Sequence, residues 1–194
     1  MFAKKYILKV QVVFLIALTA IFLAGCGSNG GTKISQDPCS LLSQEDLGSL
    51  FSGPAEGRDV SENMQTEDGT DSYPSYGCQY VLTGKVAEKS DENPFPTPEN
   101  INIQYVVVPT AQDAQKAYDK VVSLWKGSTI PNRTYQEVNG VGTKAFWSYS
   151  NNVSQFIVYK DTRVFFITLG YFKGSSDDIL AKAKVVGQKV IESI

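Results

Sequence analysis

The sequence has 194 residues, with 18 Lys and Arg against 20 Asp and Glu, and it contains no histidine. The slightly acidic balance argues against a basic surface for nucleic acid, so we expect no nucleic-acid partner. Without histidine the chain lacks the commonest general base, a common zinc ligand and every Ser-His or Cys-His nucleophile pair. We therefore expect neither an enzyme nor a metal or other cofactor. The enzymatic alternative left open is a pair of carboxylates suited to glycoside hydrolysis.

The N-terminus has the pattern of a bacterial lipoprotein signal peptide. A positive segment, with three lysines, precedes an apolar run of 14 residues at 10–23, which is shorter than a membrane span of about 20 residues. The run ends in a lipobox, made of Leu23, Ala24, Gly25 and Cys26. Small residues before a thiol are what lipoprotein processing requires, so we expect cleavage before Cys26 and a lipid on its sulfur. An uncleaved anchor helix is the alternative.

Cleavage before Cys26 divides the chain into three parts. Residues 1–25 are the signal peptide, 26–36 a glycine-rich flexible tether, and 37–194 a single extracytoplasmic domain. The mature chain of 169 residues has 15 Lys and Arg against 20 Asp and Glu, a formal net charge of −5. An acidic body gains nothing from an anionic membrane surface, so the lipid alone holds the protein to the cell membrane.

Two cysteines remain once Cys26 is assigned to the lipid, Cys39 and Cys78. An even pair in an exported chain predicts one disulfide, because the space outside the cytoplasm is oxidising. A metal pair or a redox dithiol is the alternative. Zinc sites need more ligands, however, and redox pairs favour a Cys-x-x-Cys spacing.

The first half of the domain predicts few regular elements. Asp37 and Pro38, and then Ser43, are helix-start signals, and they predict a short helix, broken or continuous, to about Leu50. Residues 52–75 are acidic and aperiodic, which favours a solvated loop over a calcium site, since the nearest candidate, 67–71, fails the Asp-x-Asp-x-Asp-Gly spacing. Alternation then predicts a strand at 76–83, followed by a proline-rich excursion over 84–100.

The second half has stronger signals. Strands are predicted at 101–108, 134–138, 144–150, 153–160 and 163–172. Helical spacing predicts a helix at 111–126, opened by Thr110 and closed by Gly127, and a final helix after Gly174, capped by Ser175 or Ser176. The sequence therefore predicts an α+β fold, with a mainly antiparallel sheet of about five to six strands packed with helices.

Turns of two residues, Asn151-Asn152 and Asp161-Thr162, fix the register of the last three strands. One face then carries the predicted core, under the two longer helices: Ala145, Trp147, Tyr149, Phe156, Val158, Phe165, Ile167 and Leu169. The opposite face carries a second set of apolar side chains: Phe146, Ile157, Tyr159, Val164 and Phe166. We expect the N-terminal helix to cover this second set, which gives an α/β/α sandwich. Alternatively Phe146, Tyr159 and Phe166 bind an apolar ligand or an envelope protein.

Three motifs, in order and behind a lipobox, resemble those of a family of small surface lipoproteins common in high-GC Gram-positive bacteria, a domain of unknown function. They are Asp37-Pro38-Cys39-Ser40-Leu41-Leu42, Cys78-Gln79-Tyr80 and Gly140-Val141-Gly142-Thr143-Lys144-Ala145-Phe146-Trp147. The resemblance spans about 37–194 and implies an α+β sandwich with the two cysteines bridged. It implies no active-site residues. The inserts at 52–75 and 84–100 look longer than the family's usual connections.

These observations favour a lipid-anchored, extracytoplasmic, non-catalytic domain that binds a small molecule, a lipid or an envelope protein. The alternative is a structural or assembly accessory that docks on a membrane complex. Docking predicts a flat aromatic patch, whereas binding predicts a concave surface with a few convergent polar groups.

Replacing the lipobox thiol tests the predicted anchor. In cells, Cys26→Ser should leave an unprocessed precursor that takes up no labelled fatty acid, because serine offers no sulfur for the diacylglyceryl group. The unmodified chain, labelled in parallel, is the control. A variant that matures and labels normally would show that the lipobox prediction is wrong.

Overall fold

A computed structural model of the chain describes residues 37–65, 72–83 and 97–194. The predicted signal peptide, the lipidation site Cys26, the tether and the rejected calcium candidate at 67–71 lie outside these residues, as does most of the predicted proline-rich segment 84–100. The described elements are η1 (Pro38–Ser40), α2 (Gln44–Leu50), β1 (Ala55–Asp59), β2 (Glu62–Gln65), β3 (Ser72–Leu82), β4 (Asn100–Val107), α3 (Ala111–Lys126), β5 (Thr134–Val138), β6 (Lys144–Ser150), β7 (Val153–Lys160), β8 (Arg163–Gly170) and α4 (Ser176–Glu192).

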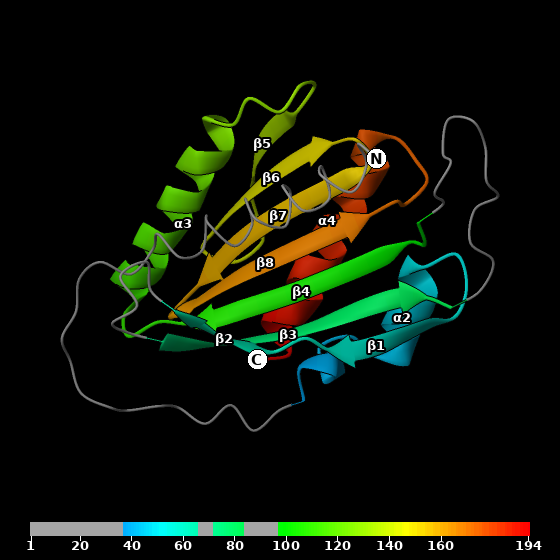
Figure 1. Ribbon diagram of the computed structural model, residues 1–194, viewed down its shortest axis with the longest axis horizontal. Coiled ribbons are helices and arrows are strands. Elements are labelled where there is room, and N and C mark those ends of the chain that lie inside the picture. Colours follow the sequence, from blue (N-terminus) through cyan, green and yellow to red (C-terminus); the bar gives the residue numbers. More distant parts are fainter. Residues whose placement is uncertain (1–36, 66–71, 84–96) are drawn as a thin grey trace.

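A fully antiparallel sheet forms the middle layer of the fold (Figure 1). Its seven-strand path runs β1-β3-β4-β8-β7-β6-β5, and β2 pairs with the other end of β3, on the same edge as β1. The α+β class is confirmed, but the predicted five to six strands are too few. The acidic segment predicted as a loop contains β1, β2 and the start of β3. These strands were missed because β1 is a charged edge strand that buries only Ala55, so it has no apolar alternation.

The helix-start signals act as the sequence predicts. The Asp37 side chain accepts from the backbone N–H of Cys39, Ser43 and Asp46 form a capping box on α2, and Thr110 caps α3. A second capping box opens α4, with Ser175 as its N-cap. The first helix is broken, since a single 3-10 turn, η1, precedes α2.

Both predicted two-residue turns are confirmed. Asn151 and Asn152 both adopt left-handed backbone conformations, which asparagine tolerates and a tight hairpin of this kind requires. The turns pair Ser150 with Val153 and Lys160 with Arg163, so both predicted faces of β6, β7 and β8 form as expected.

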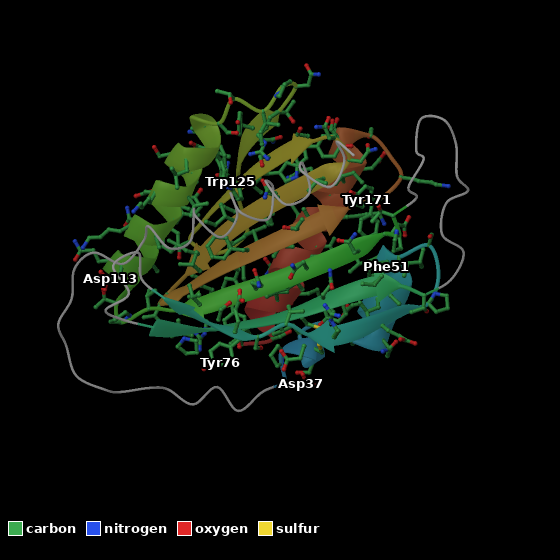
Figure 2. All side chains as sticks on the ribbon, viewed as in Figure 1. Asp37, Phe51, Tyr76, Asp113, Trp125 and Tyr171 are labelled. Atoms are coloured by element: carbon green, nitrogen blue, oxygen red, sulfur yellow. A yellow bond between two sulfur atoms is a disulfide. The ribbon has the colours of Figure 1, made fainter. Side chains whose placement is uncertain are left out.

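The predicted core face is buried under α4 together with η1 and α2. Three contacts join α2 and its C-cap to the C-terminal part of the chain. The Phe51 ring, labelled in Figure 2, packs 5.3 Å from that of Phe172. Lys182 Nζ donates to the Leu50 carbonyl at 2.8 Å, and Lys189 Nζ pairs with Asp46 Oδ1 at 3.0 Å. The N-terminal helices therefore belong to the layer of α4.

The second apolar face is covered by α3, which corrects two expectations, that the N-terminal helix covers this face and that both longer helices cover the core face. Phe146, Ile157, Tyr159, Val164 and Phe166 form one buried cluster with Val106, Val108, Ala114, Ala117, Tyr118, Val121 and Trp125. Figure 1 shows α3 and α4 on opposite sides of the sheet, so the α/β/α sandwich is confirmed with its helices differently assigned.

The disulfide explains this assignment. Cys39 in η1 is bonded to Cys78 in β3, as predicted, and Cys78 lies opposite Ile103, which lies opposite Ile167 of the core face. Cys78 therefore points to the side of α4, and the bond holds η1 there. Cross-linking positions 39 residues apart stabilises the fold by about 3 to 4 kcal/mol on the loop-entropy model.

Tyr80 reinforces the same junction. Its hydroxyl donates to the Cys39 carbonyl at 3.1 Å and accepts from the backbone N–H of Leu42 at 3.3 Å. Burial raises the pKa of Tyr80 to about 12, so the hydroxyl keeps its proton for this bond at neutral pH.

Within the described residues, no helix combines the length and the apolar character needed to cross a bilayer.

Truncating Phe166 tests the cover by α3. Phe166→Ala should lower the free energy of unfolding by about 3 kcal/mol or more, because it removes a ring buried between the sheet and α3. Chemical denaturation of the full chain measures this. Leu124→Ala, on the exposed side of α3 with 45% of the side chain accessible, is the control, and it should change the free energy by less than about 0.5 kcal/mol. Equal effects would contradict the assignment of this face to the core.

Candidate functional site

The predicted apolar binding face is not accessible. Phe146, Tyr159 and Phe166 are all at least 95% buried. Tyr118 of α3 packs on Tyr159 at a ring distance of 5.3 Å, and Trp125, on the sheet side of α3 in Figure 2, packs on Phe146 at 6.4 Å. These residues are core residues, and a binding surface has to be sought elsewhere.

The same face of the sheet becomes polar in the row next to the one that contains Phe146, Ile157 and Phe166. Directly paired residues share a face. The pairing register therefore aligns one polar side chain from each of the seven strands, the polar row: Tyr135, Ser148, Gln155, Thr168, Asn102, Gln79 and Arg58. Six strand spacings make this row about 29 Å long.

Arg133 projects into this row from the residue before β5. Its Nη2 donates to Gln155 Oε1 at 3.0 Å, so the guanidinium reaches across β6 to β7. The side chain is half-buried, its Nε is fully buried without a hydrogen-bond partner, and burial lowers the pKa of Arg133. None of the ion pairs among the described residues includes Arg133.

Three further buried polar atoms at or beside the row have no hydrogen-bond partner: Asn102 Oδ1, Ser148 Oγ and Ser150 Oγ. Ser148 is 1% exposed, so solvent does not satisfy its hydroxyl. Buried polar groups in native proteins are nearly always hydrogen-bonded, and each exception costs about 1–3 kcal/mol. Because these atoms are closed to solvent, the members of the row that a ligand could reach are the partly exposed ones, which include Thr168, Asn102 and Gln79.

The opposite face provides the contrast. Ser154, one residue from Gln155, points into the core beneath α4, and its hydroxyl accepts from Trp147 Nε1 at 2.7 Å. Ser148 and Ser154 are equally buried, but only Ser148, which belongs to the polar row, lacks a hydrogen-bond partner.

A second candidate is a pocket of about 290 Å³ between α3 and the β5–β6 turn. Its charged side chains already form two pairs, Lys126 with Glu137 at 3.8 Å and Lys144 with Asp119 at 3.9 Å. All four side chains are about half exposed or more, and such pairs contribute little. Because its charged side chains are already paired and are exposed to solvent, this pocket is a weaker candidate for a polar ligand than the polar row.

Nothing in the described part of the chain resembles a metal centre, because no three His, Cys, Asp or Glu side chains gather there. The polar row itself has hydroxyls, carboxamides and guanidinium groups, and no carboxylate or thiol. It can donate and accept hydrogen bonds and attract an anion, but it offers no group suited to general base catalysis at neutral pH.

The sequence pattern placed Ser148, Gln155 and Thr168 on the correct face. It gave them no role, because the aromatic residues beside them were the stronger signal of a binding surface. Asn102 and Gln79 could not be added, because the register between β4 and β8 joins segments far apart in the chain. The signal that could have found the row was an uncharged polar residue at the matching alternate position of β3, β4, β6, β7 and β8.

No protein-family model and no curated protein matches the chain. Among solved structures it is similar to the extracellular domain of PknH from Mycobacterium tuberculosis, with 11% identity, a TM-score of 0.47, and coverage of 78% of this chain and 96% of that one. A GTP binding regulator from Thermotoga maritima has 11% identity and a TM-score of 0.35, over 76% of this chain and 89% of that one. At these values neither similarity carries an argument.

Two serine variants test whether the row holds an unmet hydrogen bond. Ser148→Ala should raise the free energy of unfolding by about 1 kcal/mol, since it removes a buried hydroxyl without a partner. The control Ser154→Ala should lower it by about 1–3 kcal/mol, because the indole N–H of Trp147 loses its acceptor. Chemical denaturation of the full chain measures both. Destabilisation by both variants to the same extent would contradict the unpaired state of Ser148.

Proposed function

We propose that the protein is a lipid-anchored, extracytoplasmic, non-catalytic binding protein and that the polar row is its binding surface. The observation that carries the proposal is a line of partly accessible polar side chains, among them Asn102, Thr168 and Gln79, on a sheet face whose neighbouring apolar part is already covered by α3. Carboxamides and hydroxyls that converge beside an apolar cluster are suited to binding a polar ligand.

Among the ligand classes considered, the row favours a small polar molecule over a lipid. An apolar chain would need the face around Phe146 and Phe166, which α3 buries. Carboxamides and hydroxyls in a line instead provide paired donors and acceptors, and a ligand rich in hydroxyl groups, such as a saccharide, provides the complement. A saccharide of several units matches a row of about 29 Å.

Two features support the location. The lipobox at Cys26 and the tether of 26–36 would hold the domain beside the outer side of the membrane, with the polar row free to meet soluble or polymeric envelope components. The Cys39–Cys78 disulfide fits an oxidising compartment.

Docking on a membrane complex finds less support. Among the described residues the large apolar side chains that are exposed are Leu124 on α3, Val185 on α4 and Tyr171 in the connection between β8 and α4. Separate apolar residues of this kind are normal on a monomer surface and do not make a docking patch.

Ligand binding by the full chain in detergent tests the proposal. A neutral glucan tetrasaccharide should shift the NMR signals of the Gln155 and Asn102 carboxamides, and myristate should not. Thr168→Val, which keeps the shape of the side chain but removes its hydroxyl, should weaken saccharide binding about fivefold or more.

Thr134→Val on the opposite face of edge strand β5 is the matched control and should bind like the unmodified chain. The proposal fails if no saccharide shifts these signals, or if myristate binds in its place.

A further inference from the structure

We infer that the pocket between α3 and the β5–β6 turn is a binding site of its own, and that it takes a free aliphatic amino acid in its zwitterionic form. The pocket shares no residue with the polar row, so this inference does not depend on the proposed function. A volume of about 290 Å³ is at the lower end for small-molecule pockets, which suits a ligand of this size.

Both walls of the pocket carry one cation and one anion. Asp119 and Lys126 come from α3, and Glu137 and Lys144 come from β5 and β6. The charges pair across the pocket, but Lys126 Nζ lies 3.8 Å from Glu137 Oε1 and Lys144 Nζ lies 3.9 Å from Asp119 Oδ1, beyond hydrogen-bond distance. Exposed pairs of this kind contribute at most about 1 kcal/mol, so a ligand with both charges can replace them readily.

The β5–β6 turn adds backbone donors that the protein leaves unused. Val141 and Ala145 place their side chains in the core cluster beneath α4, so they line the pocket with their backbone. Among the described residues, the backbone N–H groups of Gly140 and Val141 form no hydrogen bond. Gly140 is exposed, and no atom lies within 4 Å of the place where a Cβ would be. Open N–H groups beside two lysines are the donors that a carboxylate requires.

Tyr118 indicates where the ammonium group binds. Its hydroxyl lines the pocket, has no hydrogen-bond partner among the described residues and is not one of their fully buried atoms. Burial raises the pKa of Tyr118, and the charges of Glu137 and Asp119 raise it further, so both carboxylates act on this hydroxyl. An ammonium group here can donate to the two carboxylates and to the Tyr118 oxygen.

The balance of charge favours a zwitterion over a simple ion. A lone anion would meet the repulsion of Asp119 and Glu137, and a lone cation would meet that of the two lysines. Val122, one helical turn after Tyr118, adds a half-buried aliphatic side chain to the same pocket, which favours an aliphatic side chain on the ligand.

NMR titration of the full chain in detergent tests the inference with L-valine and two analogues that each lack one charged group. The analogue 3-methylbutanoate keeps the carboxylate, and 2-methylpropylamine keeps the ammonium. L-Valine should shift the backbone amide signals of Gly140 and Val141. It should also bind about tenfold or more tightly than either analogue, because only the zwitterion meets both kinds of charge.

A pair of double variants tests the role of the lysines. Lys126→Gln combined with Lys144→Gln should remove the advantage of L-valine over 2-methylpropylamine, because the ligand carboxylate loses both cations. The matched control is Lys116→Gln combined with Lys120→Gln, which removes the same charge from α3 but changes no residue of the pocket. The control should bind L-valine within about twofold of the unmodified chain, and thermal unfolding checks that both variants fold.

Four results would overturn the inference. They are the absence of shifts at Gly140 and Val141 with about 10 mM L-valine, an analogue that binds as tightly as L-valine, an unchanged preference in the pocket variant, and an equal loss in the control. Saccharide binding to the polar row is read from the Gln155 and Asn102 carboxamides. Either proposal can therefore fail while the other holds.

Discussion

The unbroken antiparallel register across the sheet is the constraint on which the rest of the structure depends. Because paired residues share a face, one register distributes each strand's side chains between the α4 layer, the α3 layer and the polar row. A slip of one residue in β7 would exchange Phe156 with Gln155 and place a carboxamide in the core. The tight Asn151-Asn152 and Asp161-Thr162 turns prevent that slip, so two short polar segments fix both the core and the candidate site.

The disulfide has a separate effect: it determines which helices pack on which face of the sheet. Cys78 shares its face with Ile103 and Ile167, and so η1 and α2 are held beside α4. This leaves α3 as the cover for the other face. Tyr118 of α3 packs on Tyr159 of β7, and Trp125 of α3 packs on Phe146 of β6. The expectation of an N-terminal cover was wrong because the side of Cys78 depends on a register between distant strands.

Local signals explain what the sequence could predict. Caps such as Thr110 and Ser175, and turns such as Asn151-Asn152, act over a few residues, and the elements that they bound were predicted closely. The edge strand β1 was missed because its pairing depends on backbone hydrogen bonds to β3 and not on apolar alternation. The site was missed for a related reason: Ser148 is a common polar residue on its own, and it becomes informative only when Gln155, Thr168 and Asn102 align beside it.

On the face of the sheet that α3 covers, the side chains change from apolar to polar along the strands. Two neighbouring rows contain Tyr159 with Val164 and Ile157 with Phe166, all in the buried cluster with α3, and the next row contains Gln155 with Thr168. Ser148 lies in that polar row and is 1% exposed, so its hydroxyl has neither a hydrogen-bond partner nor contact with solvent, which distinguishes it from the hydroxyls of an ordinary solvated sheet face.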